Sequence, residues 1–458
     1  MNANPDKSPA IESLSDPSSL EHYGRDWTRF WTPSPSKVVF PRSTGEVVEL
    51  VRWARACGKA LVPSGGRTGL SGGAVAADGE VVVSMEKMRE VIAFDSAEPS
   101  LTVQAGMPVG QLQNLAAEQG WFYPVDWAAA ESSQVGGSIA TNAGGIRVLR
   151  YGMTRDWVLG LTAVTGTGEV LRLNRGLVKN NAGLDLRHLM IGSEGILGII
   201  TEATMALAPQ PLEQSVLLLS FSDLDAIMPA FATLRQSLNL SAFEFFDQRS
   251  VRHVAEAGRL DFPLDESAPF HAVVEFDDPG QASQEKALEV FESLVEQGQV
   301  TDGTISQSGA QAEELWHWRE AISESIAERT PYKNDLSVRI GTIPEFLRDL
   351  DRLVEQEYPD FEVVWFGHIG DGNLHMNVLK PEDWSIDDFH RAGRELSPKV
   401  FALVQRYNGS VSAEHGVGLL KRDDLGWSRE SGEIELMKSI KRLFDPDGIL
   451  NPGKMLNG

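Results

Sequence analysis

The 458-residue chain has an ordinary share of hydrophobic residues, 42%, and a formal net charge of -24. The length suggests two or three domains of about 150 residues each, and so acidic a chain, with no basic run, is a poor partner for nucleic acid or an anionic membrane. The single cysteine, Cys57, excludes an intrachain disulfide and favours a cytoplasmic location.

The N-terminal segment is acidic and polar as far as His22. It has neither the apolar centre of a secretory signal nor the Arg-rich composition of a transit peptide, so we expect no targeting segment. The longest apolar runs, such as Val216–Phe221, are far shorter than the roughly 20 residues of a membrane span. Residues 1–35 are expected to form a loosely ordered lead.

Residues 36–211 are expected to form the first domain. Ser43 and Glu46 fit a capping box, and apolar residues at helical spacing continue as far as Gly58, which predicts a helix. The further predicted elements are strands at 60–63, 81–85 and 101–105 and a helix over 109–119. This mixture of helices, short strands and glycine-rich turns predicts an α+β domain rather than a regular βαβ array.

Three glycine-rich segments lie in this domain, at 63–73, 131–145 and 191–201. The first has five glycines in nine residues, Gly65 to Gly73, and could turn several backbone N–H groups toward one phosphate. Its spacing matches neither the Gly-x-Gly-x-x-Gly pattern nor the P-loop. Three such segments suit a long polar ligand such as a dinucleotide; unrelated glycine turns are the alternative.

A second domain is predicted at 212–425, because apolar strands begin to alternate with charged helices after Pro209 and Pro211. Its predicted elements are apolar strands at 216–221 and 271–276 and charged helices at 283–297 and 312–328. Residues 426–458 form a C-terminal segment that contains an amphipathic helix over 430–444. No internal repeat is visible in the sequence.

Two histidines flank a predicted hairpin turn. Asp371-Gly372 is a pair preferred in two-residue type I′ turns, and counting outward from it places His368 opposite His375. Directly opposed residues have β-carbons about 5 Å apart, close enough for both imidazoles to reach one metal. Asn377 lies two positions after His375 and shares its face. Two histidines packed in a sheet without a metal are the alternative.

Glu414, in the segment Ser-Ala-Glu-His-Gly, offers a third metal ligand. Two histidines and a carboxylate leave coordination positions open, as in catalytic zinc sites, and manganese or iron(II) would accept the same ligands. In the predicted helix over 315–323, Arg319 and Ser323 are four residues apart and share one face. Lys333 follows soon after. Solvated surface charge is the alternative interpretation of these three residues.

These motifs resemble those of the vanillyl-alcohol oxidase family of FAD-linked oxidoreductases, and within it the D-2-hydroxy-acid dehydrogenases. The resemblance extends from about residue 36 to the C-terminus. It implies a two-subdomain FAD-binding domain, a substrate and metal domain with an antiparallel sheet, and a C-terminal segment that packs on the FAD domain. Covalent members attach flavin through His or Cys, which the loops at 63–73 and 134–145 lack, so the resemblance implies non-covalent FAD.

The resemblance also implies roles for individual residues. It makes His368, His375 and Glu414 the metal ligands and His415 the general base. The implied substrate contacts are Arg319, Ser323, Lys333 and Asn377, where Ser323 replaces the usual Thr of the family. The implied FAD contacts are Pro63, Ser64, Gly65, Gly66, Arg67, Thr68, Gly69, Ser71, Gly72, Ser133, Gly136, Gly137, Ala140, Thr141, Asn142, Gly144, Gly145, Glu194, Gly195, Gly198, Ile199, Ile200 and Asn451.

The implied reaction is the oxidation of D-2-hydroxyglutarate to 2-oxoglutarate by hydride transfer to flavin N5, with metal-assisted removal of the hydroxyl proton. The alternatives are a D-lactate or glycolate dehydrogenase of the same architecture and, from another class, a non-catalytic flavin-binding electron carrier. The implied partners are an electron acceptor, such as an electron-transfer flavoprotein or a quinone, and a second copy in a homodimer.

Overall fold

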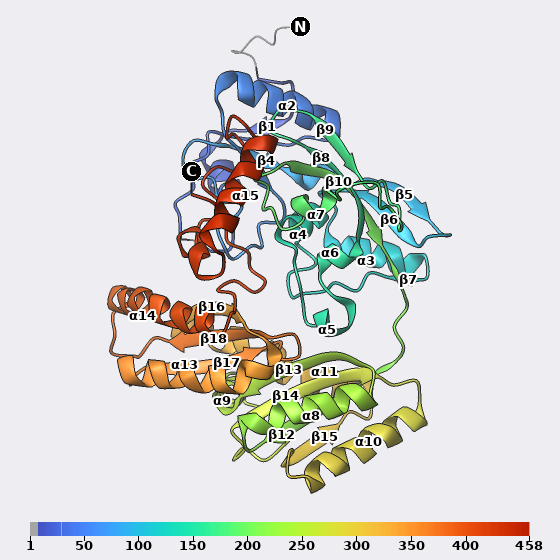
Figure 1. Cartoon of the computed structure of the whole chain (residues 1–458), viewed down its shortest axis with the longest axis vertical. Helices are drawn as coiled ribbons and strands as arrows, with labels where there is room; N and C mark the ends of the chain where they lie inside the picture. Colours follow the sequence, from blue (N-terminus) through green and yellow to red (C-terminus); the bar gives the residue numbers. More distant parts are fainter. Residues whose placement is uncertain (1–7, 29, 458) are drawn as a thin grey trace. The chain divides into compact units, whose positions relative to one another are not determined.

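The computed structural model describes residues 8–28 and 30–457. Its internal contacts divide the chain into two compact units (Figure 1). Unit 1 contains the chain as far as Gly145, then Gly152–Gln210, then everything from Glu414 onward, while unit 2 contains Ile146–Tyr151 and Pro211–Ala413. The expected boundaries after residues 211 and 425 stay predictions. Residues 1–7 and 29 of the expected lead lie outside the described residues.

Unit 1 contains a four-stranded sheet of strand order β1-β2-β4-β3. Its strands are β1 (Ser13–Leu14), β2 (Lys37–Val39), β3 (Leu61–Ser64) and β4 (Val81–Ser84). Helix α2 (Thr44–Cys57) begins where the Ser43 hydroxyl accepts a hydrogen bond from the Glu46 N–H at 3.2 Å, and it ends at Gly58 in the left-handed conformation. The predicted helix, its start at Ser43 and its end at Gly58 are therefore confirmed, but the capping box is incomplete because the Glu46 carboxylate accepts from the Arg42 N–H and not from that of Ser43.

The second sheet of unit 1 is antiparallel, with strand order β5-β6-β10-β8-β9. Its strands are β5 (Val91–Asp95), β6 (Ser100–Gln104), β8 (Val158–Val164), β9 (Val170–Leu173) and β10 (Ile199–Ala206). Helices α2 and α4 (Val135–Thr141) contact this sheet. Helix α15 (Ser431–Phe444) packs Ile434, Met437 and Ile440 on the same hydrophobic core, so the C-terminal segment belongs to unit 1.

Unit 2 is built on a seven-stranded antiparallel sheet of order β15-β12-β14-β13-β17-β18-β16. Its strands are β12 (Gln214–Phe221), β13 (Leu240–Asp247), β14 (Phe270–Asp277), β15 (Asp302–Ile305), β16 (Tyr332–Ser337), β17 (Glu362–Gly367) and β18 (Asn373–Leu379). Its main helices are α8 (Leu224–Ser237), α9 (Gln248–Gly258), α10 (Gln281–Glu296), α11 (Gly309–Glu320), α12 (Ile322–Ser325), α13 (Ile343–Glu357) and α14 (Ile386–Arg406). The expected α+β class with an antiparallel sheet is confirmed.

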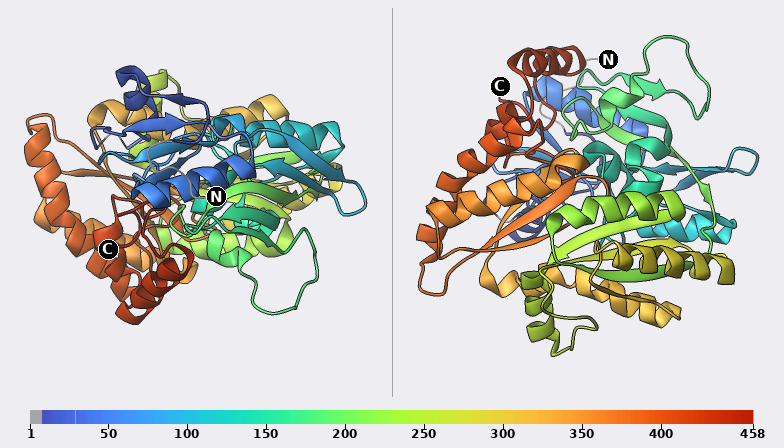
Figure 2. Two further views of the ribbon diagram at one scale, coloured as in Figure 1. Left: turned by 90° about the horizontal axis from the view of Figure 1, so that it is seen from above. Right: turned by 60° about the horizontal axis from the view of Figure 1, so that its bottom comes forward.

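The two faces of this sheet carry different helices (Figure 2). On one face, Asp351 of α13 accepts a hydrogen bond from the Trp365 indole and Phe231 of α8 packs on Phe243. On the other face, α9, α11 and α12 share a hydrophobic cluster with Phe246 and the neighbouring strands. Side chains alternate between the faces along each strand, so strand register decides which residues can form a site.

Unit 2 consists of two halves with the same topology, which the sequence did not reveal. The first half runs β12-α8-β13-α9-β14-α10-β15 and the second runs β16-α13-β17-β18-α14, so the two orders agree apart from α9, which is inserted between β13 and β14. A single bridge between Ser337 and Ser410 stands where the second half would have its fourth strand. The halves meet where Phe246 of β13 pairs with Phe366 of β17. This junction acts as a pseudo-twofold centre for the sheet.

The strand registers on the two sides of this junction correspond. In the first half, Phe246 pairs with His271, which pairs in turn with Ser220. In the second half, Phe366 pairs with His375, and His375 with Asp335 of β16. His271 is therefore the structural counterpart of His375.

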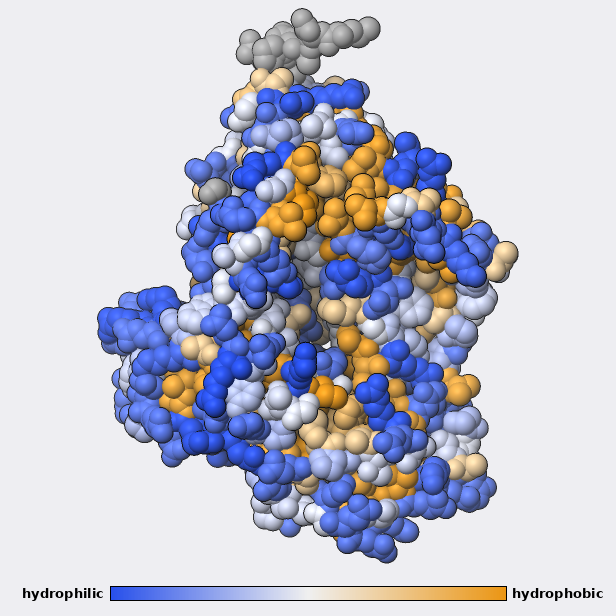
Figure 3. Space-filling model, in the orientation of Figure 1, coloured by the Kyte–Doolittle hydropathy of each residue, from blue (hydrophilic) through white to orange (hydrophobic). Residues whose placement is uncertain are grey.

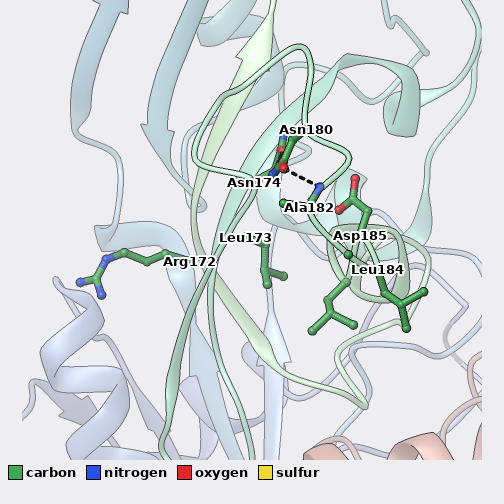
Figure 4. A pocket seen from close by; sticks show the side chains of 9 residues that line it. Arg172, Leu173, Asn174, Asn180, Ala182, Leu184 and Asp185 are labelled. Atoms are coloured by element: carbon green, nitrogen blue, oxygen red, sulfur yellow. Dashed lines mark hydrogen bonds between the residues drawn. The ribbon is translucent and has the colours of Figure 1, made fainter.

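A long loop connects β9 to α7 (Arg187–Met190) in unit 1 (Figure 2). The Asn174 amide donates to the Leu159 and Leu177 carbonyls, both at 2.6 Å, and accepts from Asn180 at 3.0 Å. A cavity of about 140 Å³ lies along this loop (Figure 4). Its lining contains none of the predicted site residues, so it is separate from the candidate site.

No helix within residues 8–28 and 30–457 combines the length and the apolar character needed to cross a bilayer.

Candidate functional site

The structure brings the three glycine-rich segments together in unit 1. The Thr68 and Ser133 hydroxyl oxygens lie 2.9 Å apart and join the first segment to the second. The Glu194 N–H donates to the Ala140 carbonyl at 2.8 Å and joins the third segment to the second. These contacts arrange the predicted FAD-binding loops around one region.

Close backbone approach requires glycine at two points of this region. A β-carbon at Gly66 would lie 2.0 Å from the Ser132 carbonyl oxygen, and one at Gly145 would lie 1.7 Å from that of Asp126. Arg67 has a left-handed backbone with φ 58°. The direction of the N–H groups therefore changes along the first loop, as in backbone nests that bind anions.

Several buried polar atoms beside the loops have no hydrogen-bond partner among the described residues. They are Ser64 Oγ, Gln134 Oε1 and Asn451 Oδ1. The Asn451 amide nitrogen donates to the Gly73 and Glu194 carbonyls at 2.9 and 2.7 Å, which ties the C-terminal tail to two of the loops. Leaving buried polar atoms unpaired is costly, so the region fits a polar ligand such as a dinucleotide cofactor.

The histidine hairpin differs from its predicted form. Phe366, and not His368, pairs with His375. The predicted two-residue type I′ turn is wrong, because the His368 carbonyl accepts hydrogen bonds from the N–H groups of Asp371, Gly372 and Asn373. Gly372 has φ 96°, but Asp371 is not left-handed, whereas a type I′ turn needs positive φ at both positions. The connection is therefore a longer loop that begins at His368.

The two imidazoles nevertheless lie close together, with the edge of one ring toward the face of the other. Their ring centroids lie 5.4 Å apart with an interplanar angle of 82°. Side chains alternate with a period of two residues, so a register error of two keeps His368 on the same face as His375, whereas an error of one would have moved it to the other face. The predicted proximity of the two rings on one face is confirmed, whereas the predicted direct pairing of His368 with His375 is wrong.

Glu414 completes a group of residues that could hold a metal ion. One ligand atom from each of His368, His375 and Glu414 lies within 4.8 Å of the others. Glu414 follows directly on Ala413, whose N–H donates to the Asp335 carboxylate at 3.1 Å, and Asp335 pairs with His375 across the sheet. Two imidazoles and one carboxylate fit a divalent cation such as Zn²⁺, Mn²⁺ or Fe²⁺.

A buried carboxylate that sequence reasoning missed contacts this group. Glu244 of β13 is 1% exposed and accepts a hydrogen bond from His368 Nδ1 at 2.8 Å. With the carboxylate as the acceptor of this bond, His368 carries its proton on Nδ1, and Nε2 is the ring atom left for a metal. The sequence signal was a single acidic residue inside an apolar strand, between Phe243 and Phe245.

The first half of unit 2 contains a corresponding histidine, His271, whose two ring nitrogens both have hydrogen-bond partners within the protein. His271 is fully buried, with Nδ1 3.0 Å from Ser220 Oγ and Nε2 2.7 Å from Gln248 Oε1. Gln248 stands two residues after Phe246, as His368 does after Phe366. Burial lowers the pKa of His271 to about 4, so this ring stays neutral as a core residue.

Three of the expected substrate contacts lie near this group on unit 2. Lys333 and Asn377 pair across β16 and β18 and share the face of His375. The Lys333 side chain is exposed, and partial desolvation of its amine lowers its pKa. Arg319 is buried with its guanidinium 4.7 Å above the Phe366 ring, and its Nε has no hydrogen-bond partner among the described residues.

Ser323 differs from these residues. The expected single helix over 315–323 is divided into α11 and α12, which are separated by Ala321. Arg319 is buried whereas Ser323 is exposed, so the two side chains have different environments.

His415 lies on a segment that is anchored to the third glycine-rich loop. Its Nε2 is 3.4 Å from a Glu414 oxygen, and Gly416, with φ 77°, turns the chain directly after it. The N–H groups of Val417 and Gly418 donate to the Glu194 carboxylate, each at 2.7 Å. Burial raises the pKa of Glu194 although these bonds oppose the shift. His415 therefore follows directly on a predicted metal ligand, Glu414, and stands two residues before a segment that is hydrogen-bonded to a predicted FAD-binding loop.

Comparison with known proteins gives matches over both parts of the chain. Residues 35–174 match the family described as FAD binding domain, and residues 210–455 match FAD linked oxidases, C-terminal domain. A D-2-hydroxyglutarate dehydrogenase of Xanthomonas citri pv. viticola is 53% identical, over 98% of this chain and 94% of that protein. One of Stutzerimonas stutzeri is 52% identical, over 96% and 95%. A mitochondrial D-2-hydroxyglutarate dehydrogenase of Bos taurus is 38% identical, over 97% and 81%.

Solved structures with little sequence identity share the fold. A 4-ethylphenol oxidase from Gulosibacter chungangensis superposes with a TM-score of 0.73 at 18% identity, over 97% of this chain and 94% of that one. A p-cresol methylhydroxylase gives 0.72 at 15% identity, over 97% and 93%. This similarity concerns the architecture alone.

Proposed function

Because the chain belongs to the family of FAD-linked oxidases, we propose that it is an FAD-dependent dehydrogenase that oxidises D-2-hydroxyglutarate to 2-oxoglutarate. The observation that carries the proposal is the group of His368, His375 and Glu414, with His415 next to it in the sequence. The names of relatives that are 52–53% identical over nearly the whole chain support the choice of substrate.

The proposed chemistry divides between bound groups and side chains. When bound, non-covalent FAD supplies at N5 the acceptor for the hydrogen and electron pair that leave C2, and a divalent cation, proposed as zinc, supplies Lewis acidity. His368, His375 and Glu414 hold the cation. The neutral imidazole of His415 accepts the proton of the 2-hydroxyl group. Loss of these two hydrogens converts the C2–O bond into the carbonyl of the 2-oxo acid.

A second carboxylate distinguishes 2-hydroxyglutarate from lactate, and binding it requires local cations in a chain with net charge -24. Lys333 is an exposed residue whose amine is partly desolvated, and Arg319 retains an Nε–H without a partner among the described residues. Ser323 and Asn377 are proposed as hydrogen-bonding contacts. These groups support a dicarboxylate substrate over a monocarboxylate.

Steady-state kinetics test this substrate assignment. We expect kcat/KM for D-2-hydroxyglutarate to exceed that for D-lactate by about 100-fold, the value of one or two charge-assisted hydrogen bonds. Lys333→Met should reduce this ratio about tenfold or more. Lys399→Met is the matched control, because Lys399 is an exposed lysine of α14 that pairs with Glu357. Equal values for the two substrates, or a preference for lactate, would contradict the assignment.

The proposed partners are an electron acceptor, such as an electron-transfer flavoprotein or a quinone, and a second copy of the chain. Figure 3 shows apolar surface on unit 1. The exposed large apolar side chains of this unit include Leu177, Val178 and Leu184 in the loop after β9 and Leu436 and Leu443 on α15. Exposed apolar patches mark interaction surfaces, which supports a protein partner for this unit.

A further inference from the structure

Glu244 joins two functional candidates through one buried carboxylate. One oxygen accepts the His368 Nδ1 hydrogen bond at 2.8 Å, and the other lies 2.8 Å from Arg319 Nη2. The Glu244 and Arg319 side chains are 1% and 8% exposed. An ionised carboxylate is strongly disfavoured at such a depth unless it is paired. Here one oxygen is hydrogen-bonded to His368 and the other is held by an ion pair with Arg319 rather than by a hydrogen bond.

The pseudo-twofold arrangement of unit 2 shows that this carboxylate is specific to one half. Glu244 stands two residues before Phe246 on β13, and His368 stands two residues after Phe366. Because Phe246 pairs with Phe366, this register places Glu244 across from His368. The counterpart of Glu244 in the second half is Val364, two residues before Phe366. Val364 lies across from Gln248, which is the counterpart of His368. The protein thus has a carboxylate beside the histidine of the metal-ligand group and an apolar residue at the counterpart, where neutral hydrogen bonds satisfy His271.

The position of His368 explains why it needs such a partner. His375 lies within β18 and packs against Phe366 at a ring distance of 5.0 Å. His368 is the first residue after β17 ends at Gly367, and the three hydrogen bonds to its carbonyl fix its backbone but not its imidazole ring. The orientation of its ring therefore depends on side-chain contacts such as that with Glu244.

We infer that Glu244 is a positioning residue of the metal centre, which holds His368 as its Nδ1–H tautomer with Nε2 directed to the cation and couples this ligand to Arg319. Carboxylates that accept the second N–H of a ligating histidine fix the ring and raise its basicity. The inference rests on the proposed function, because it concerns the metal group of the proposed dehydrogenase. It goes beyond that function in proposing that one carboxylate positions both a metal ligand, His368, and a cation proposed to bind the substrate, Arg319.

Glu244→Gln tests the inference while preserving the shape of the side chain. The amide oxygen of Gln can accept from His368 only if its NH₂ group is turned toward Arg319, so one of the two contacts is lost in either orientation. We expect the affinity of the FAD-loaded full-length protein for Zn²⁺ to fall about 10- to 100-fold, measured by competition with a chromophoric chelator. The absorption spectrum of bound Co²⁺ should change, and KM for D-2-hydroxyglutarate should rise.

Asp351→Asn is the matched control, because this carboxylate also contacts β17, through the Trp365 indole on the opposite face. Its Zn²⁺ affinity is expected within about twofold of that of the unchanged protein, since it touches no ligand. A Glu244→Gln affinity within about threefold of the unchanged protein would overturn the inference, because partners of ligating histidines contribute about tenfold or more.

Two further variants separate the possible failures. If His375→Ala weakens metal binding and Glu244→Gln does not, the inference fails and the proposed metal centre stands. If His375→Ala leaves binding unchanged, the metal centre itself is refuted. Should Glu244→Gln not fold, Glu244→Asp keeps the charge for Arg319 but withdraws the carboxylate by about one bond length, ~1.5 Å. Its Zn²⁺ affinity should fall at least about fivefold, and an unchanged affinity would overturn the inference.

Discussion

Replacing His415 with alanine is expected to lower kcat by about two to four orders of magnitude, the usual contribution of a positioned general base. The side chain is partly exposed, and its Nε2 lies 3.4 Å from a Glu414 oxygen. Its removal leaves the Glu194 bonds of the following residues intact. The variant should therefore fold and keep its flavin absorbance and zinc content while turnover collapses.

His188→Ala is the control for this experiment. His188 is an exposed histidine of α7 in the same unit and belongs to neither the ligand group nor the predicted FAD contacts, so its variant should turn over normally. If His415→Ala kept more than about half of the original kcat, far above the loss expected for a general base, another group would have to accept the hydroxyl proton.

Replacing His375 with alanine is expected to release the metal. Loss of a ligand should weaken zinc binding by more than the 10- to 100-fold seen for outer partners of ligands, so by over about 100-fold. Turnover should fall with metal occupancy. The unchanged protein should lose turnover when treated with a chelator and recover it on addition of zinc, whereas His375→Ala should not recover at stoichiometric zinc. Elemental analysis after gel filtration measures the occupancy.

His271→Gln is the matched control, because His271 occupies the position of His375 in the other half of unit 2. It removes a fully buried imidazole from the same kind of strand pair and should lower the free energy of unfolding while leaving zinc affinity unchanged. If His375→Ala bound zinc as tightly as the unchanged protein, both histidines of the hairpin would be core residues, like His271.

The parts of the fold that the sequence predicted depend on local patterns. Ser43 and Gly58 mark the ends of α2 because capping is set by neighbouring residues. The glycine-rich segments and the histidine motif carried the family resemblance, which the matches over 35–174 and 210–455 confirm. The placement of His368 and His375 close together on one face was predicted for a similar reason, since the alternation of side chains in a strand is independent of the turn.

Features set by distant contacts could not be predicted in this way. The loop after His368 is stabilised by three hydrogen bonds to the His368 carbonyl, and the Asp-Gly pair does not predict this arrangement. The segment Ile146–Tyr151 belongs to unit 2, where Arg147 makes two bonds to Glu275 at 2.8 and 2.9 Å. Glu244 meets His368 across 124 residues of sequence. The two halves of unit 2 share topology without visible sequence similarity.

The most direct test is the anaerobic addition of D-2-hydroxyglutarate to the FAD- and zinc-loaded protein while the flavin absorbance band is followed. The account predicts that this band is bleached by stoichiometric D-2-hydroxyglutarate, is little affected by the L-isomer, and is no longer bleached once a chelator has removed the metal. A yellow protein that no 2-hydroxy acid bleaches would be a flavin-binding carrier rather than a dehydrogenase, and a colourless protein would contradict the FAD site itself.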